Sequence, residues 1–274
     1  MIKKRIFREH NYSAFFNEES TLRFALDSTK PITKLEYPEF YDIAINNKCN
    51  ANCPWCYVDA KSDGENFEYI LDKIYTLFGN MNENQRPFSV AIGGHGEPTL
   101  HPDFCEFIWV LRSLGITPNY TTNGQHLTEE IIEYTKKYVG GVAVSTHDHL
   151  DWITPYQIFV GNNITPHLHM IISDNVSVHK LYDIAAAYKT HLVLLPYQTL
   201  GRAKPVESGF GFLFEMLKKH PLENISFGAG FLPHLKDKPW LNLSLYDEGL
   251  FSAYLKMDDM KVYNSSFDLT ERVL

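Results

Sequence analysis

The stretch FYDIAINNKCNANCPWCY, residues 40–57, joins a short apolar run to a loop that carries three of the four cysteines of the chain. The run has the length and composition of a β-strand, and Cys49, Cys53 and Cys56 follow it directly. Parallel sheets place their ligand sites in loops at the carboxyl ends of their strands. The stretch therefore predicts where the sheet begins and where its chemistry lies.

Downstream of this stretch, β-branched or aromatic runs alternate with amphipathic segments, an order typical of βα units on a parallel sheet. One amphipathic segment covers residues 67–78, and we expect Gly79 to end it in the left-handed conformation. Thr128 and Ser177 are expected to cap two later helices. The expected strands cover residues 41–45, 89–92, 118–121, 141–145, 166–172 and 192–195.

These six strands predict an α/β fold, a partial (β/α)6 TIM-like barrel over residues 39–205. A short N-terminal segment, residues 1–38, is expected to hold strands near 12–16 and 23–26. Residues 206–274 form a small C-terminal extension. Each loop that follows a strand of the barrel is a candidate for the site.

Composition narrows the class of protein. The chain has 25 Lys and Arg against 33 Asp and Glu, a net charge of -8, so no basic field draws it to long nucleic acid or anionic lipid. It has neither an N-terminal apolar run of signal-peptide length nor any run approaching roughly 20 apolar residues. Because the cysteines cluster instead of spreading as a disulfide framework does, we expect a cytoplasmic protein with thiolate metal ligands.

The cysteine spacing favours a reactive metal centre. Structural zinc normally takes four ligands, but this loop offers three, and the remaining Cys105 lies in a predicted helix as a buried core thiol. A site with three protein ligands leaves a coordination position open for chemistry. A zinc site or a ferredoxin-like electron carrier is the alternative. The paired histidines at 147 and 149 and at 167 and 169 are interpreted as pocket or surface residues.

The cysteine loop resembles the CxxxCxΦC signature of the radical S-adenosylmethionine (radical SAM) superfamily, in which Φ is aromatic and is here Trp55. The resemblance implies that Cys49, Cys53 and Cys56 bind three irons of a 4Fe-4S cluster. It also implies that S-adenosylmethionine (SAM) binds the fourth iron, with Trp55 or Tyr57 beside the cluster and the adenine.

Further strand-end segments add to the resemblance. Gly93-Gly94-His95-Gly96-Glu97-Pro98 follows the second strand and is similar to the GGEP element of the family through Gly94, Gly96 and Glu97, with His95 inserted. The resemblance implies that this element contacts the methionine amino group of SAM. It likewise implies that three residues near the ends of the third and fourth strands contact the methionine carboxylate and the ribose: Thr122, Asn123 and Ser145.

The resemblance implies an enzyme that reductively cleaves SAM to a 5'-deoxyadenosyl radical, which abstracts hydrogen from an organic substrate, with a peptide or protein favoured. The alternatives are modification of a nucleoside or small metabolite, or a non-catalytic iron–sulfur electron-transfer module. Flavodoxin or ferredoxin is the implied electron donor, and no membrane partner is expected. No residue is identified as a catalytic acid or base. After the sixth strand, a loop is interpreted as meeting an anionic or amide substrate through Tyr197, Gln198, Arg202 and Lys204.

The C-terminal segments 246–255 and 261–267 resemble the start of the SPASM-type extension of peptide-modifying members of the superfamily. In that family the extension carries cysteines for auxiliary clusters, but no cysteine follows Cys105 here. We therefore predict a degenerate, cluster-free extension that shapes the substrate pocket or covers the open edge of the barrel.

Overall fold

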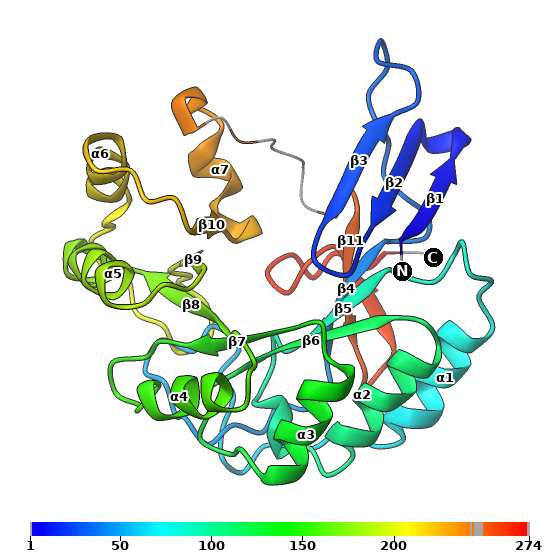
Figure 1. Cartoon of the computed structure of the whole chain (residues 1–274), viewed down its shortest axis with the longest axis horizontal. Helices are drawn as coiled ribbons and strands as arrows, with labels where there is room; N and C mark the ends of the chain where they lie inside the picture. Colours follow the sequence, from blue (N-terminus) through cyan, green and yellow to red (C-terminus); the bar gives the residue numbers. More distant parts are fainter. Residues whose placement is uncertain (1, 242, 244–248, 273–274) are drawn as a thin grey trace.

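A curved nine-stranded sheet forms the centre of the computed structural model, which describes residues 2–241, 243 and 249–272 (Figure 1). The strand order is β10-β9-β8-β7-β6-β5-β4-β11-β12, and every neighbouring pair is parallel except β11 with β12. The strands are β4 (Phe40–Ala44), β5 (Ser89–Ile92), β6 (Thr117–Thr122), β7 (Gly141–Ser145), β8 (His167–Ile172), β9 (Leu192–Pro196), β10 (Ile225–Phe227), β11 (Ser252–Lys256) and β12 (Lys261–Tyr263).

Helices connect the parallel strands and cover the outer side of the sheet (Figure 1). On β5, Val90 and Ile92 are fully buried in the core shared with the helices, whereas Ser89 and Ala91 alternate with them and are half-buried. On this strand the inner side of the sheet is thus left to small side chains. The helices are α1 (Ile70–Gly79), α2 (Phe104–Ser113), α3 (Glu129–Tyr138), α4 (Ile153–Gly161), α5 (Asn175–Ala187), α6 (Phe210–Lys219) and α7 (Leu232–Leu235), with 3-10 turns at Arg8–His10, Pro98–Leu100, Ala229–Phe231 and Pro239–Leu241.

The predicted partial barrel is confirmed, and β4 to β9 match the six expected strands within one residue at each end. The C-terminal part of the chain extends this sheet at both ends, since β10 pairs with β9 and β11 pairs with β4. The division of the chain at residues 38 and 205 stays a prediction. Residues 246–248 of the SPASM-like segment lie outside the described residues.

A separate antiparallel sheet precedes the barrel and consists of β1 (Lys3–Phe7), β2 (Tyr12–Phe16) and β3 (Thr21–Ala25). Its apolar face packs as a second core against three residues from elsewhere in the chain, Leu35, Phe88 and Phe251. The first strand was not expected because KKRIF is rich in charge. Its Arg5 is nevertheless buried, with the guanidinium 4.6 Å from the centre of the Phe88 ring.

Two predicted helix ends are wrong and one is confirmed. Gly79 is the last residue of α1, and the Asn80 that follows has φ -78°, so the helix ends without a left-handed residue. Thr128 caps α3 as predicted, since its hydroxyl accepts a backbone N–H from the first turn. Asp174, not Ser177, caps α5; the two residues exchange hydrogen bonds as a capping box. No helix among the described residues is both long and apolar enough to cross a membrane.

Candidate functional site

The three clustered cysteines lie together on the loop that follows β4. All three are half-buried and free of disulfide bonds. The Cys49 N–H donates to the Lys61 carbonyl at 2.8 Å, and the Cys56 N–H donates to the Cys53 carbonyl at 3.2 Å. Backbone hydrogen bonds therefore shape a loop that belongs to no helix or strand. The fourth cysteine, Cys105, lies on α2 as predicted, but it is half-buried against the main core and not fully buried within it.

The thiols of the loop influence one another. Burial, with smaller contributions from the neighbouring Cys49 and Cys56, raises the pKa of Cys53 to about 12. Burial likewise raises the pKa of Cys49, with a smaller contribution from Cys56. These thiols are close enough for their charges to repel, so a bound cation is needed to hold all three as thiolates.

Two N–H groups point at the sulfur atoms. The Ala60 backbone donates to Cys56 Sγ at 3.4 Å, and Asn123 Nδ2 donates to Cys49 Sγ at 3.7 Å. Such hydrogen bonds tune iron–sulfur clusters. Among the residues that the structure describes, no three His, Cys, Asp or Glu side chains are arranged to share one metal ion. A 4Fe-4S cluster does not need that arrangement, because each thiolate binds a different iron.

The glycine-rich loop after β5 lies directly against the cysteine loop. The Glu97 N–H donates to the Lys48 carbonyl at 2.7 Å, next to Cys49. Gly96 has φ +61°, and a Cβ there would lie 2.2 Å from Asn46 Oδ1. This position requires glycine because both its conformation and its close contact exclude a side chain.

The carboxyl group of Glu97 is fully buried and joins three segments of the site. Its Oε1 accepts hydrogen bonds from the Thr99 and Thr122 hydroxyls at 2.8 and 2.7 Å, and its Oε2 accepts the Asn123 N–H at 2.7 Å. Burial raises the pKa of Glu97, and these hydrogen bonds oppose that rise. Both oxygens are thus satisfied by protein donors. The predicted contact of Glu97 with SAM stays a prediction, and within the protein this side chain organises the loops.

Thr122 and Asn123 follow β6 and face the cysteine loop. Asn123 contacts Cys49 as described, and its Nδ2 also donates to Asn50 Oδ1 at 2.8 Å. Glu97 therefore holds Asn123, and Asn123 holds the part of the cysteine loop around Cys49. Sequence alone placed these residues at neighbouring strand ends, and the structure joins them by hydrogen bonds.

Of the remaining predicted SAM contacts, Trp55 and Tyr57 lie on the cysteine loop itself, Gly94 lies on the loop after β5, and Ser145 lies at the end of β7. The Trp55 ring packs edge-on against His147 and His149, and its indole N–H is buried without a hydrogen-bond partner among the described residues. Tyr57 Oη donates to the Gly94 carbonyl at 2.9 Å. Ser145 ends β7, beside His169 of β8. SAM binding by these residues stays a prediction.

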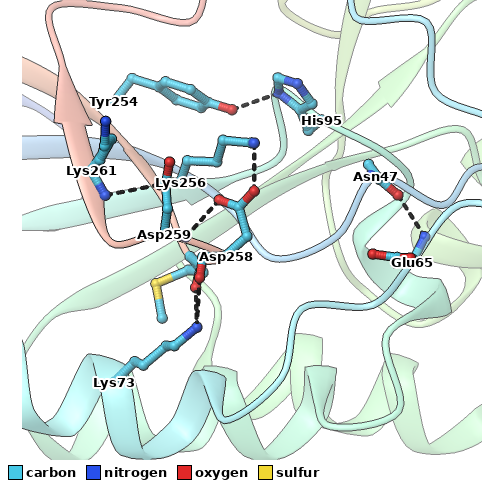
Figure 2. A network of polar contacts seen from close by, with 10 residues as sticks. Asn47, Glu65, Lys73, His95, Tyr254, Lys256, Asp258, Asp259 and Lys261 are labelled. Atoms are coloured by element: carbon cyan, nitrogen blue, oxygen red, sulfur yellow. Dashed lines mark hydrogen bonds and ion pairs between the residues drawn. The ribbon is translucent and has the colours of Figure 1, made fainter. Parts of the chain in front are cut away.

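The C-terminal extension contributes residues that the sequence analysis did not identify. Tyr254 on β11 shares a hydrogen bond of 2.5 Å with His95 Nδ1, as Figure 2 shows, and its ring would contact a Cβ at Gly94. Burial lowers the pKa of His95 to about 4, so its imidazole is neutral near pH 7. Nearby, Lys256 pairs with Asp258 (Figure 2). No local motif marks Tyr254, because its partner is 159 residues away.

The loop after β9 makes contacts within the protein that the sequence did not predict. Arg202 contacts the cysteine loop through its guanidinium, and Tyr197 Oη donates to the Lys204 carbonyl at 2.7 Å within its own loop. The predicted substrate contact of Arg202 stays a prediction, and within the protein three of its N–H donors are directed at two carbonyls and a carboxylate.

The fold is a parallel α/β barrel, and its three thiols and glycine-rich loop lie at the carboxyl ends of the strands. These features are typical of a barrel protein that binds a cofactor. Residues 43–149 match the family model described as the radical SAM superfamily. This match places a radical SAM domain in the part of the chain that holds the cysteine loop and the glycine-rich loop. The family cofactors are a 4Fe-4S cluster and SAM, and the three thiols, the N–H groups aimed at sulfur and the unpaired indole N–H fit them.

Among sequence relatives, the 7,8-dihydro-6-hydroxymethylpterin dimethyltransferase of Methanocaldococcus jannaschii is 29% identical over 136 residues, which cover 48% of this chain and 26% of that protein. This chain spans about a quarter of the length of the curated relatives it matches first.

Solved structures share the fold. The structure of Streptococcus suis SuiB bound to S-adenosylmethionine has a TM-score of 0.70 at 13% identity. The match covers 96% of this chain and 81% of the SuiB chain. Native anSMEcpe with AdoMet and the Cp18Cys peptide has a TM-score of 0.56 at 16% identity and covers 86% of this chain and 75% of its own.

Proposed function

We propose that this protein is a radical SAM enzyme that reductively cleaves SAM and abstracts hydrogen from a peptide substrate. The observation that carries the proposal is the set of three half-buried thiols on one loop, packed against the glycine-rich loop after the next strand. When bound, the cluster and SAM supply an electron and, after carbon–sulfur cleavage, a 5'-deoxyadenosyl radical. What the protein supplies is binding, orientation and exclusion of water.

The residues of this chain divide that work between them. Cys49, Cys53 and Cys56 bind iron as thiolates, and Glu97 with Asn123 keeps the loop that carries them in place. We assign SAM to the surrounding strand ends because their backbone and hydroxyl groups converge there. The residues assigned to SAM are Trp55, Tyr57, Gly94, Gly96, Glu97, Thr122, Asn123 and Ser145, with Glu97 acting through the loops that its carboxylate joins.

A peptide substrate is supported by two structures of the same fold. SuiB is also described in complex with the precursor peptide SuiA, and anSMEcpe with the Cp18Cys peptide. On the inner side of the sheet, Thr121 Oγ1 and His169 Nδ1 lie 3.5 Å apart. Both side chains can form hydrogen bonds, and neither carries a net charge near pH 7 because burial lowers the pKa of His169 to about 4. Neutral donors and acceptors suit the amides of a peptide.

A small metabolite is the second candidate. The relative from Methanocaldococcus jannaschii is named for a pterin, which is a small heterocycle. A flavodoxin or ferredoxin is the proposed electron donor for either substrate class.

An anaerobic assay tests the proposal. Reconstituted protein with dithionite and SAM should release 5'-deoxyadenosine. The Cys53→Ala variant should release none, whereas Cys105→Ser should behave as wild type because Cys105 lies on α2, packed against the core and outside the cysteine loop. An iron–sulfur electron carrier or a zinc protein would release no 5'-deoxyadenosine in any form, and that result contradicts the proposal.

A further inference from the structure

The loop after β9 is fastened to the cysteine loop by Arg202. Its Nε donates to the Cys53 carbonyl at 2.7 Å, and its Nη2 donates to the Ala60 carbonyl at 2.5 Å. Its Nη1 lies 3.3 Å from Asp59 Oδ1 in an ion pair. One side chain thus holds three residues of the loop segment that contains Cys53 and Cys56.

The backbone of the same loop reinforces this contact. The Arg202 N–H donates to the Cys56 carbonyl at 3.1 Å. Gly201 has φ +58°, and a Cβ there would lie 2.5 Å from the Cys56 carbonyl oxygen. The two loops therefore approach so closely that only glycine fits before the arginine.

The guanidinium suits this position in both shape and charge. The Arg202 side chain is 22% exposed, so its hydrogen bonds to carbonyl groups are partly protected from water. A planar fork makes several directed hydrogen bonds at once, which a lysine ammonium does not reproduce. Its fixed positive charge also lies beside a loop that carries three thiolates when iron is bound.

The other half of the cysteine loop is held differently. Asn123, itself held by Glu97, contacts Cys49 and Asn50. Arg202 contacts the half with Cys53 and Cys56, so the two supports act on different cysteines.

We infer that Arg202 is a positioning residue for the iron–sulfur cluster, which fixes the segment bearing Cys53 and Cys56 and places a positive charge beside it. This inference rests on the proposed function. Residues that orient metal ligands typically contribute about 10-fold to 100-fold to metal affinity. The charge should also raise the reduction potential of the cluster, because reduction adds negative charge to it.

The test compares Arg202→Gln, Arg202→Lys and Lys204→Gln in anaerobically reconstituted protein. Lys204 is the matched control: it is an exposed cation of the same loop, and no contact of its ammonium is found among the described residues. The measurements are iron release to a ferrous chelator, the reduction potential, and the electron paramagnetic resonance spectrum of the reduced cluster. Circular dichroism checks the folding of each variant.

We expect R202Q to release iron about 10-fold to 100-fold faster than wild type and to have a more negative potential. R202K should keep a potential near that of wild type but release iron faster, because it keeps the charge and loses the fork. K204Q should match wild type in all three measurements.

Release of iron from R202Q at the rate of K204Q overturns the inference. If R202Q does not fold, R202K decides: faster release supports the positioning role, and the wild-type rate overturns it. Wild-type protein that binds no cluster would instead contradict the proposed function, so the two failures are distinguishable.

Discussion

Glu97 shows how one buried side chain can organise a site through hydrogen bonds to the loops around it. Its two oxygens accept hydrogen bonds from the loops after β5 and β6, and one of these loops holds Cys49 through Asn123. A buried carboxylate is tolerated only where donors surround it. The donors here come from Thr99, Thr122 and Asn123.

The substitution Glu97→Gln should destabilise the fold by about 1–3 kcal/mol. The new amide NH2 group is itself a donor, and it would replace a carboxylate oxygen that now accepts a hydrogen bond from a protein donor. Urea unfolding measures the loss, and iron content after reconstitution should fall with it. Glu106→Gln on the exposed side of α2 is the control and should change neither quantity. Equal behaviour of the two variants would show that Glu97 does not hold the loops.

His169 makes stability depend on pH. Burial lowers its pKa to about 4, with smaller contributions from His167 and His191. In the unfolded chain its pKa returns to about 6.5, so between these values the unfolded state binds more protons. The stabilisation is complete above about pH 6.5 and is lost as the pH falls toward 4. The free energy of unfolding should drop by about 2 kcal/mol from this residue between pH 7 and pH 5.

Urea unfolding at a series of pH values measures this drop. His169→Gln should remove about 2 kcal/mol of the drop between pH 7 and 5, since this residue no longer titrates. His95 and His147, whose pKa values burial also lowers to about 4, should keep the rest of the slope. His126→Gln removes an exposed histidine and should leave the profile unchanged. A wild-type slope in H169Q would disprove the assignment.

At the scale of elements, β11 belongs to the core although it lies far from the barrel strands in sequence. It pairs in parallel with β4, and Ala253, Tyr254 and Leu255 are buried to 1% exposure or less. Because β11 pairs with β4, the strand that leads to the cysteines has no unpaired edge on that side.

Leu255→Ala should therefore cost about 2–5 kcal/mol of stability, as expected for a fully buried leucine. Leu269→Ala is the control because this side chain is 60% exposed, and it should change stability by less than about 0.5 kcal/mol. Chemical denaturation measures both. A small effect of L255A would mean that the extension only rests on the barrel.

Elements with strong local signals were predictable, and those that depend on distant partners were not. The strands β5 and β7 match their predictions at both ends because their β-branched runs stop at polar or glycine residues. Helix α4 was not identified, since ITPYQIFVG is apolar on every side and has no single stripe. The cysteine and glycine loops were identified from local motifs. The positioning role of Arg202 was not, because its partners lie at least 142 residues away.

For the whole molecule, the site is assembled from loops after four strands and from one strand of the extension. Glu97 and Asn123 join two loops to Cys49, Arg202 joins a third to Cys53, and Tyr254 joins the extension to His95. Ligand binding at this point should therefore stabilise the entire fold. No cysteine follows Cys105, so we predict one cluster of about four iron atoms per chain.

SAM should raise the melting temperature of the reconstituted protein and have little effect on the iron-free protein. In the proposed site SAM would bind at the cluster, so removal of the cluster should remove the strongest contact of SAM. At a concentration about 100 times its dissociation constant, SAM should add about 2.7 kcal/mol. Anaerobic calorimetry measures the shift, with Cys53→Ala as a second iron-poor control. An equal shift with and without iron would place SAM binding elsewhere in the protein, and more than about four iron atoms per chain would contradict the single cluster.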